Sequence, residues 1–504
     1  MKFKAFLISI PLLIIISLCV LVACSQKEVE HIHKNTYYQK ENVIEPTCST
    51  KGQYDLVEYC SDCNSEVERE IVNLPASAHT ASNNVCSVCN KTASVGLEYE
   101  LNENDAYTVV GLGTCTDNQI IIPTHYNGKP VTTIGRRAFY GTTGIYAISC
   151  QLELERIEGY AFEECVDLTS VYILSNVKSL LDGVFSGCTK LDSLTFNSAV
   201  DYISSPFYGC ELLRKVNFLG DVNEWAQIYF YSNPTFYSRD LYINGNLLTD
   251  LVLDDSTTEI SMNAFCDLKS LKTVKLPENL KKVGHGTFYS DFPNLELNEY
   301  DNALYLGNDT NKYLMLVKAK DDSISSCKIH PDTKIIGSFA FSTCYELTSI
   351  ELPDGLLFIG MYSFGYCVKI TNLVIPESVE YIDNYAFSDT GLKNVTFLPS
   401  HCEYAYSIFS GVGFDNGGLE VKIGANVTVI PGCMFTHSGG GSRPANIKSL
   451  TFEKNSKCTE IEYNAFHDCP NAFDVYYFDS KEQWDAISVD YGNEMLISAN
   501  KHFE

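Results

Sequence analysis

Tryptophan and basic residues are scarce in this 504-residue chain, which holds only two Trp. It contains 36 Lys and Arg residues and 63 Asp and Glu residues, which gives a formal net charge of −27 at pH 7. A surface this acidic repels phosphate groups, so it excludes binding of nucleic acid or anionic lipid through a broad basic face. The length predicts two or three domains, or a repeat array, rather than one compact core.

The motifs of common nucleophilic and metal-dependent enzymes are also missing. The sequence contains no Gly-x-Ser-x-Gly and no His-Glu-x-x-His, and its ten His are scattered. Carboxylates are numerous, but no two of them are singled out as the pair that a glycosidase requires. We therefore expect that the protein is not an enzyme.

Only one apolar run of membrane-spanning length is present, so everything after Cys24 is expected to lie outside the membrane. Lys2 and Lys4 precede this run, which covers residues 5–22 and is typical of a targeting signal. It ends in Leu-Val-Ala-Cys, which resembles a bacterial lipobox. The resemblance implies that residues 1–23 are a removed signal peptide and that lipid on Cys24 anchors the exported chain to the bacterial membrane, facing the cell surface. An uncleaved membrane helix is the alternative.

Residues 24–47 are mostly polar and are expected to tether a small cysteine-rich module over residues 48–92. Two Cys-x-x-Cys pairs, Cys60 with Cys63 and Cys86 with Cys89, have the ligand spacing of a zinc ribbon. Because so small a module has too little core to fold alone, we expect these thiolates to hold a structural zinc ion. Disulfides are the rival interpretation, since exported chains meet oxidising surroundings, and elemental analysis distinguishes the two. Spare metal ligands are His31, His33, His79 and Cys48.

A repeat dominates the rest of the sequence. The stretch IEGYAFEECVDLTSVYI begins at Ile157, and a near copy, IGSFAFSTCYELTSIEL, begins at Ile336. Many copies follow one another after 22 or 23 residues, a period typical of a solenoid whose turns bury their apolar sides against one another. The Phe that marks each copy occurs at Phe139, Phe162, Phe185, Phe207, Phe265, Phe288, Phe341, Phe364, Phe387, Phe409, Phe435 and Phe466.

Each copy also carries a short strand pattern in which apolar and polar positions alternate, as in residues 168–173, 324–329 and 347–352. Two longer gaps between Phe markers predict hairpin insertions near residues 219–247 and 298–320. The first insertion contains Asn244-Gly245, a favoured tight turn. The expected order is an N-terminal cap with the first strands over 93–138, the repeat array over 139–478 and a C-terminal cap over 479–504.

The repeat, written IGxxAFxxCxxLxxVxLP, resembles that of the BspA-like leucine-rich repeat family of bacterial and protist surface proteins over about residues 95–480. The resemblance implies an α/β-type repeat solenoid, a curved and right-handed leucine-rich repeat that is β-rich with short helical or irregular segments. It also implies a cell-surface protein, since some members are implicated in adhesion to host proteins or other cells. The two insertions and the irregular units near Phe409 and Phe435 depart from the pattern.

Cysteines recur three residues after many of the marker Phe residues, and we expect them to be buried structural thiols, because catalytic cysteines do not form a ladder. Trp225 and Trp484 each precede an Ile by three residues, which predicts one face of a short helix. Both Trp are expected to plug an interruption or the end of the array. A ligand-stacking platform formed by Trp225 and Tyr237 of the first insertion is the alternative.

Two polar positions in each strand alternate with the core positions, and stacking aligns them into two rows on one sheet face. We expect this face to be a concave surface that mediates protein–protein interaction or adhesion to an extracellular protein of a host, the matrix or another cell. Capture of a glycan or nutrient is the alternative function, and it would use the aromatic side chains of the first insertion, namely Trp225, Tyr229, Phe230, Tyr231, Phe236, Tyr237 and Tyr242. The rows consist of Ser170, Tyr172, Ser193, Thr195, Thr273, Lys275, Ser349, Glu351, Asn372, Val374, Asn394, Thr396, Ser449 and Thr451.

Overall fold

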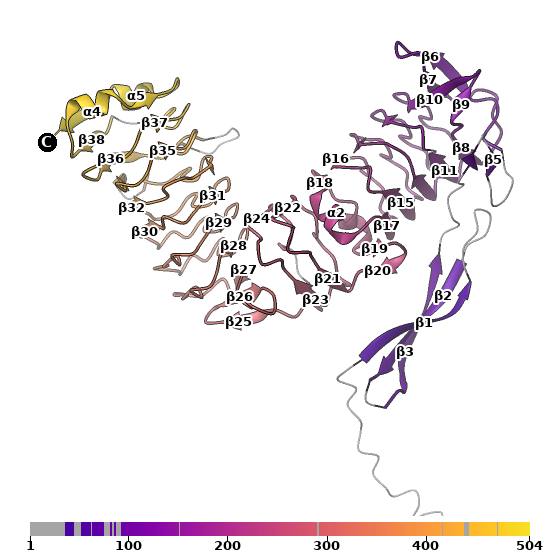
Figure 1. Ribbon diagram of the computed structural model, residues 1–504, viewed down its shortest axis with the longest axis horizontal. Coiled ribbons are helices and arrows are strands. Elements are labelled where there is room, and N and C mark those ends of the chain that lie inside the picture. The colour runs from indigo at the N-terminus through magenta and orange to yellow at the C-terminus, as the bar shows by residue number, and fades with distance from the viewer. Residues whose placement is uncertain are drawn as a thin grey trace, which may run out of the picture. The chain divides into compact units, whose positions relative to one another are not determined.

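The computed structural model describes residues 36–44, 52–61, 63–74, 81–82, 85–86, 92–150, 152–289, 292–415, 417–437, 443–470 and 472–503. The chain divides into two compact units, Met1–Ser77 and Ala78–Glu504. Both units are built mainly of strands, and the helices among the described residues are short (Figure 1).

The N-terminal unit is a three-stranded antiparallel sheet in the order β1-β2-β3. Tyr54 and Val57 of the central strand are buried. Arg69 crosses the sheet, with ion pairs of 3.0 Å to Glu41 and 2.7 Å to Asp55. The strands are β1 (Thr36–Ile44), β2 (Gly52–Cys60) and β3 (Glu66–Leu74).

The second unit is a β-solenoid, as the repeat predicts. A typical turn contributes one strand to each of two columns, and the marker Phe lies between them. In the turn of Phe162, β12 (Arg156–Ile157) precedes the Phe and β13 (Ser170–Ile173) follows it. Strands of one column run in the same direction, so each pairs in parallel with its copy in the next turn, as β13 does with β15 (Ser193–Asn197).

The column that follows the marker Phe forms two long sheets with a two-stranded sheet between them in sequence (Figure 1). The first has the order β20-β19-β17-β15-β13-β11-β8, with β8 (Gln119–Ile121), β11 (Ala147–Cys150), β17 (Lys215–Leu219), β19 (Leu241–Ile243) and β20 (Asn246–Leu247). The pair is β21 (Asp250–Val252) with β23 (Thr273–Lys275). The second consists of β30 (Asn372–Ile375), β32 (Asn394–Phe397), β34 (Leu419–Ile423), β36 (Ile447–Phe452), β38 (Asp474–Tyr477) and β40 (Asn500–Phe503), in that order.

The column that precedes the marker Phe consists mostly of two-residue strands. These are β14 (Ser179–Leu180), β16 (Tyr202–Ile203), β18 (Tyr229–Phe230), β22 (Glu259–Ile260), β24 (Lys282–Val283), β28 (Ile335–Ile336), β29 (Phe358–Ile359), β31 (Tyr381–Ile382), β33 (Tyr404–Ala405), β35 (Val429–Ile430), β37 (Glu460–Ile461) and β39 (Ser488–Val489). The N-terminal end of the unit contains β4 (Ala81–Ser82), β5 (Val85–Cys86), β6 (Glu98–Leu101), β7 (Tyr107–Gly111), β9 (His125–Tyr126) and β10 (Lys129–Ile134).

The predicted Phe ladder is confirmed and forms the centre of the core. Phe364 lies between Phe341 and Phe387, with ring centroids 5.3 and 5.4 Å away and nearly parallel planes. All three rings are at most 1% exposed. The rings stack in three runs, from Phe139 to Phe207, from Phe265 to Phe288 and from Phe341 to Phe466, and the buried apolar residues form two core clusters. Stacking is needed because a single turn cannot bury its own apolar side.

The cysteine ladder is buried, also as expected, and four of its thiols donate to a backbone carbonyl of the previous turn. Cys188 Sγ donates to the carbonyl oxygen of Phe162 at 3.2 Å, and Cys367 donates to that of Phe341 at 3.1 Å. A thiol at this position thus fills a small apolar space and also satisfies a backbone carbonyl of the previous turn.

The first insertion contains the expected tight turn. β19 and β20 pair antiparallel around Asn244 and Gly245, both of which have positive φ. Such a turn suits the twist of the two strands. The second insertion is a three-stranded antiparallel piece made of β25 (Asn298–Tyr300), β26 (Ala303–Leu306) and β27 (Met315–Ala319).

Two predicted strands are wrong: residues 324–329 and 347–352 form no strand. The second insertion explains this, because Gly307 takes the place beside β23, where its carbonyl accepts from Leu276 N–H. Residues 324–329 therefore have no neighbouring strand with which to form sheet hydrogen bonds. The two segments still lie one above the other, linked by Thr348 N–H to Ser325 O at 3.1 Å.

Both Trp lie on short helices, as predicted. Trp225 belongs to α2 (Val222–Gln227), whose start is fixed by a capping box between Asp221 and Glu224. Trp484 belongs to α4 (Lys481–Asp485). The remaining described helices are α3 (Thr235–Ser238) and α5 (Glu494–Ile497).

Candidate functional site

The predicted rows exist in the first long sheet, but part of them is inaccessible. Ser170 pairs with Ser193, and Tyr172 with Thr195. Every residue of β15 from Ser193 to Phe196 is buried, including Ser193 and Thr195 at the polar-facing positions. A binding role for Tyr172, Ser193 and Thr195 is therefore contradicted, and burial raises the pKa of Tyr172 to about 12. Ser170 is half-buried.

The middle of the array interrupts the rows. Thr273 and Lys275 are exposed in β23, where Thr273 Oγ1 donates to Asp250 at 2.6 Å. Ser349 and Glu351 are also exposed, but they lie outside any strand. These side chains can be reached by a ligand, yet they do not belong to one continuous surface.

The second long sheet carries rows that are accessible along its whole length. In all six strands, the two positions that alternate with the core-facing positions are exposed or half-buried. Asn394, for example, pairs with Asn372 on one side and Glu420 on the other. We call this surface the strand-row face. Within this part of the solenoid, β30, β32, β36 and β38 lie on the outer side of the bend and the two-residue strands β29, β31, β35 and β37 on the inner side, so the expectation of a concave surface is wrong (Figure 1). Its first row is Asn372, Asn394, Glu420, Ser449, Asp474 and Asn500, and its second is Val374, Thr396, Lys422, Thr451, Tyr476 and His502.

Charges on the strand-row face are balanced by opposite charges. Glu420 forms an ion pair of 2.6 Å with Lys448, and Lys422 forms one of 2.5 Å with Glu453. Exposed pairs contribute little to stability. Their effect is to leave a mixed polar surface on a protein that is strongly acidic as a whole.

The sequence pattern predicted only about half of the residues of the strand-row face. Glu420 and Lys422 lie in β34, which falls in an irregular gap between marker Phe residues. The pattern Leu-Glu-Val-Lys-Ile in that strand alternates strictly and could have identified it. Tyr476 and His502 were also missed, and their rings stack with centroids 4.7 Å apart.

The first insertion does not present Trp225 to solvent. Trp225 is fully buried, and its indole N–H donates to Ala264 O at 2.7 Å. Its ring packs against Phe230 at 4.9 Å between centroids, and also against Phe196 and Phe218. Trp225 is therefore a structural plug, and its alternative role as a ligand platform is contradicted.

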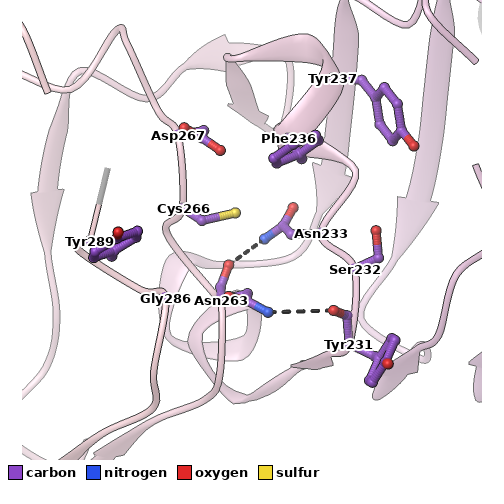
Figure 2. A pocket seen from close by; sticks show the side chains of 10 residues that line it. All are labelled: Tyr231, Ser232, Asn233, Phe236, Tyr237, Asn263, Cys266, Asp267, Gly286 and Tyr289. Carbon is purple, nitrogen blue, oxygen red and sulfur yellow. Dashed lines mark hydrogen bonds between the residues drawn. The ribbon is translucent and has the colours of Figure 1, made fainter. Parts of the chain in front are cut away.

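Tyr237, in contrast, lines a cavity of about 370 Å³ between the first insertion and the following turns. Figure 2 shows Tyr289 on one side of this cavity and Phe236 and Asn233 on the other, with Cys266 between them. We call it the aromatic pocket. Its lining includes Tyr231, Asn233, Phe236, Tyr237, Asp267 and Tyr289.

A dense hydrogen-bond network holds the floor of the aromatic pocket. The buried Asn233 Nδ2 donates to Asn263 O at 2.8 Å and to Ala264 O at 3.1 Å. Asn233 Oδ1 accepts from both the backbone N–H and the hydroxyl of Thr235, each at 2.8 Å. With its polar groups satisfied, Asn233 ties the insertion to the next turn and fixes the shape of the pocket.

The cysteine-rich module can be followed only in part. Cys60 is the last residue of β2 and is buried, whereas Cys63 is exposed, with Sγ 2.9 Å from Ser65 Oγ. Cys89, Cys24 and the side chain of Cys86 lie outside the described residues. In the described part of the chain no cluster of His, Cys, Asp or Glu has metal-binding geometry. Zinc binding and lipidation therefore stay predictions.

The thiols of the repeat array are poorly suited to nucleophilic chemistry. Burial raises the pKa of Cys165 and of Cys210 to about 12. The thiolate is the reactive form, so these residues are almost entirely in the inert thiol form at neutral pH. None of the helices within the described ranges has the length and hydropathy needed to cross a membrane.

Three solved structures are among those similar to this chain. A leucine-rich cell surface protein from Faecalibacterium prausnitzii is 19% identical, with 79% of this chain and 97% of that one covered and a TM-score of 0.28. The pneumococcal vaccine antigen PcpA is 18% identical (82% and 98% covered, TM-score 0.33). A leucine-rich repeat protein from Bacteroides ovatus is 18% identical (81% and 98% covered, TM-score 0.22).

The comparison with curated proteins found no match. Residues 113–237, 238–307 and 319–441 match the BspA type leucine rich repeat region, in six copies. This match covers more than half of the chain and agrees with the Phe ladder and the two strand columns. The chain belongs to the BspA-type leucine-rich repeat family.

Proposed function

We propose that this chain is a cell-surface protein that binds another extracellular protein through the strand-row face and catalyses no reaction. The observation that carries the proposal is the pair of in-register rows along the second long sheet, in which no side chain is buried. Six strands spaced about 4.8 Å apart give the face a length of roughly 25 Å. A surface of that extent suits a protein better than a small molecule.

The chemistry of the strand-row face supports many weak contacts with one anchor. Most of its side chains are short and polar, such as Asn394, Thr396 and Ser449. The exposed Tyr476, backed by the stacked His502, is the large amphipathic group expected of an anchor. Modest affinity at each copy would be offset by multivalency on a crowded cell surface.

Anchoring by lipid is the second part of the proposal and rests on the Leu-Val-Ala-Cys sequence that ends at Cys24. Cells that express the full chain and take up a fatty-acid analogue should label it, and the Cys24→Ala variant should lose the label and leave the membrane fraction. Equal labelling and membrane retention of the variant would contradict this part of the proposal.

Binding through the strand-row face predicts a large effect of new charge on it. The double variant Asn394→Arg with Thr396→Arg should bind a panel of immobilised host extracellular proteins about tenfold more weakly than the wild type, because an uncompensated charge must be desolvated at the interface. Surface plasmon resonance with the full chain measures the loss.

A matched variant places the same charge elsewhere. Thr258 is exposed, precedes β22 and lies outside the strand-row face, so Thr258→Arg should leave binding unchanged. Thermal unfolding of both variants should match the wild type. Unchanged binding by the double variant, or equal losses in both, would show that this face is not the binding surface.

Capture of a glycan is the alternative function, and the aromatic pocket is the observation that favours it. A saccharide is best held in a concave site with rings and polar groups, and the aromatic pocket is such a site.

A further inference from the structure

We propose that the aromatic pocket binds a neutral saccharide. This site is separate from the strand-row face and takes a different class of ligand. Part of its lining, including Phe236 and Tyr237, comes from the first insertion, and the rest, including Asn263 and Tyr289, comes from the two repeat turns that follow.

Exposed rings are the first reason for this assignment. Tyr231, Phe236 and Tyr289 are 65%, 53% and 60% exposed, although large aromatic side chains are usually buried where a core is near. A pyranose ring presents a face of C–H groups that stacks on such rings, while its hydroxyl groups accept and donate hydrogen bonds. Tyrosine suits both requirements, since it combines an apolar ring with a hydroxyl.

The size of the pocket is the second reason. Its volume of about 370 Å³ lies at the lower end of the range for ligand pockets. A ligand of one or two sugar rings matches this volume, whereas a folded protein surface does not enter it. Figure 2 shows the rings of Phe236 and Tyr289 across the cavity from each other, so one sugar could contact both.

The electrostatics of the pocket favour a neutral ligand. Aromatic cages also bind quaternary ammonium groups, so a cation is the main competing ligand. Here Arg239 already lies over the Phe236 ring, with its guanidinium carbon 5.2 Å from the centroid. The same guanidinium forms an ion pair of 2.8 Å with Asp267. A cationic ligand would therefore be repelled by Arg239, which already lies beside the Phe236 ring. It would also find the Asp267 carboxylate already paired with Arg239.

The pocket is also rigid enough to be a preformed site. Gly286 has a φ of 79°, and a Cβ added to it would lie 1.8 Å from Asn263 Oδ1. The conflict is with the end of the Asn263 side chain, and the positive φ is the reason that glycine is favoured here. Together with the Asn233 network, this fixes the floor before any ligand arrives, which lowers the entropy cost of binding.

A stack of rings leads away from the pocket and distinguishes two sources of the saccharide. Tyr289 lies 4.4 Å from Phe339, which lies 5.7 Å from Tyr362, and Tyr362 lies 5.0 Å from Tyr385, between ring centroids. Phe339, Tyr362 and Tyr385 are half-buried. A glycan chain that leaves the pocket on this side would contact further rings, whereas a free sugar would not.

The test is a glycan array probed with the full chain. The array carries neutral mono- and oligosaccharides of glucose, galactose, mannose and N-acetylglucosamine, together with phosphocholine. We expect binding to at least one neutral saccharide, and about tenfold weaker binding by Phe236→Ala and Tyr289→Ala, which each remove one stacking ring. Phe236→Tyr keeps the ring and should retain binding.

Controls separate loss of the site from loss of the fold. Tyr491 is 75% exposed and belongs to a different part of the array, so Tyr491→Ala should bind like the wild type. The charge variants of the strand-row face should also bind saccharide normally. Weaker binding of an oligosaccharide, but not of its monosaccharide, by Tyr362→Ala identifies a glycan chain as the ligand, and an equal response to both identifies a free sugar.

Three results would overturn the proposal. The first is that no neutral saccharide on the array is bound. The second is that Phe236→Ala and Tyr289→Ala both bind as strongly as the wild type while their thermal unfolding is unchanged. The third is that phosphocholine alone is retained, which would assign the pocket to a cationic ligand.

Discussion

Replacing Phe364 with alanine is expected to lower the free energy of unfolding by about 3–5 kcal/mol. Phe364 is 1% exposed and stacks between Phe341 and Phe387, so its removal leaves a cavity that neither neighbour can fill without shifting its own turn. Each turn of a solenoid is stabilised mainly by its neighbours, so the loss should appear as early melting of the turns around residue 364. Chemical denaturation with hydrogen exchange measures both effects.

A surface ring of the same turn provides the control. Tyr366 is 42% exposed, and Tyr366→Ala should change the free energy of unfolding by no more than about 0.5 kcal/mol. If Phe364→Ala were as stable as Tyr366→Ala, the Phe ladder would not be the centre of the core.

Replacing Trp225 with alanine should have an effect of similar size, about 3–5 kcal/mol. The ring is fully buried among Phe196, Phe218 and Phe230, and its N–H satisfies the carbonyl oxygen of Ala264. Its loss removes the plug that packs α2 against β15, β17 and β18. Calorimetry of the full chain should show a lower melting temperature, and the aromatic pocket should lose its shape because Ala264 also accepts from Asn233.

Trp225→Phe separates packing from hydrogen bonding. It keeps most of the apolar contact but leaves Ala264 O with the Asn233 amide alone, so it should cost about 1–3 kcal/mol. A Trp225→Ala variant with wild-type stability would show that this helix is not part of the core, and the ring would then be available as a ligand platform.

The part of the fold that repeats could be predicted from sequence, because it depends on patterns among residues that are close in the chain. The period of the marker Phe residues predicts the stacked rings, and the alternation within residues 168–173 predicts β13. The Asn244-Gly245 dipeptide predicts the antiparallel turn, because few residues adopt positive φ without strain. Each of these rules concerns residues that are adjacent in the chain or one repeat apart.

Accessibility of the rows could not be predicted in the same way. Tyr172 and Thr396 occupy equivalent strand positions, yet the first is 6% exposed and the second is half-buried on an open sheet. The alternation in sequence states which residues share a face, but it does not state how much of each side chain the packed structure leaves exposed. Likewise, residues 324–329 have the strand pattern but no ladder, because Gly307 from the insertion takes the place beside β23.

By itself, the sequence determined the solenoid, its core of Phe and Cys, the positions of both insertions and membership of a repeat family. The tertiary structure alone decided that the accessible rows lie on the second long sheet and that aromatic side chains of the first insertion form a pocket with two later turns. The physical reason is that the pocket joins Tyr231, Asn263 and Tyr289, which come from different turns. Their proximity follows from how an irregular insertion packs on the next turn, and no periodicity within one repeat encodes that contact.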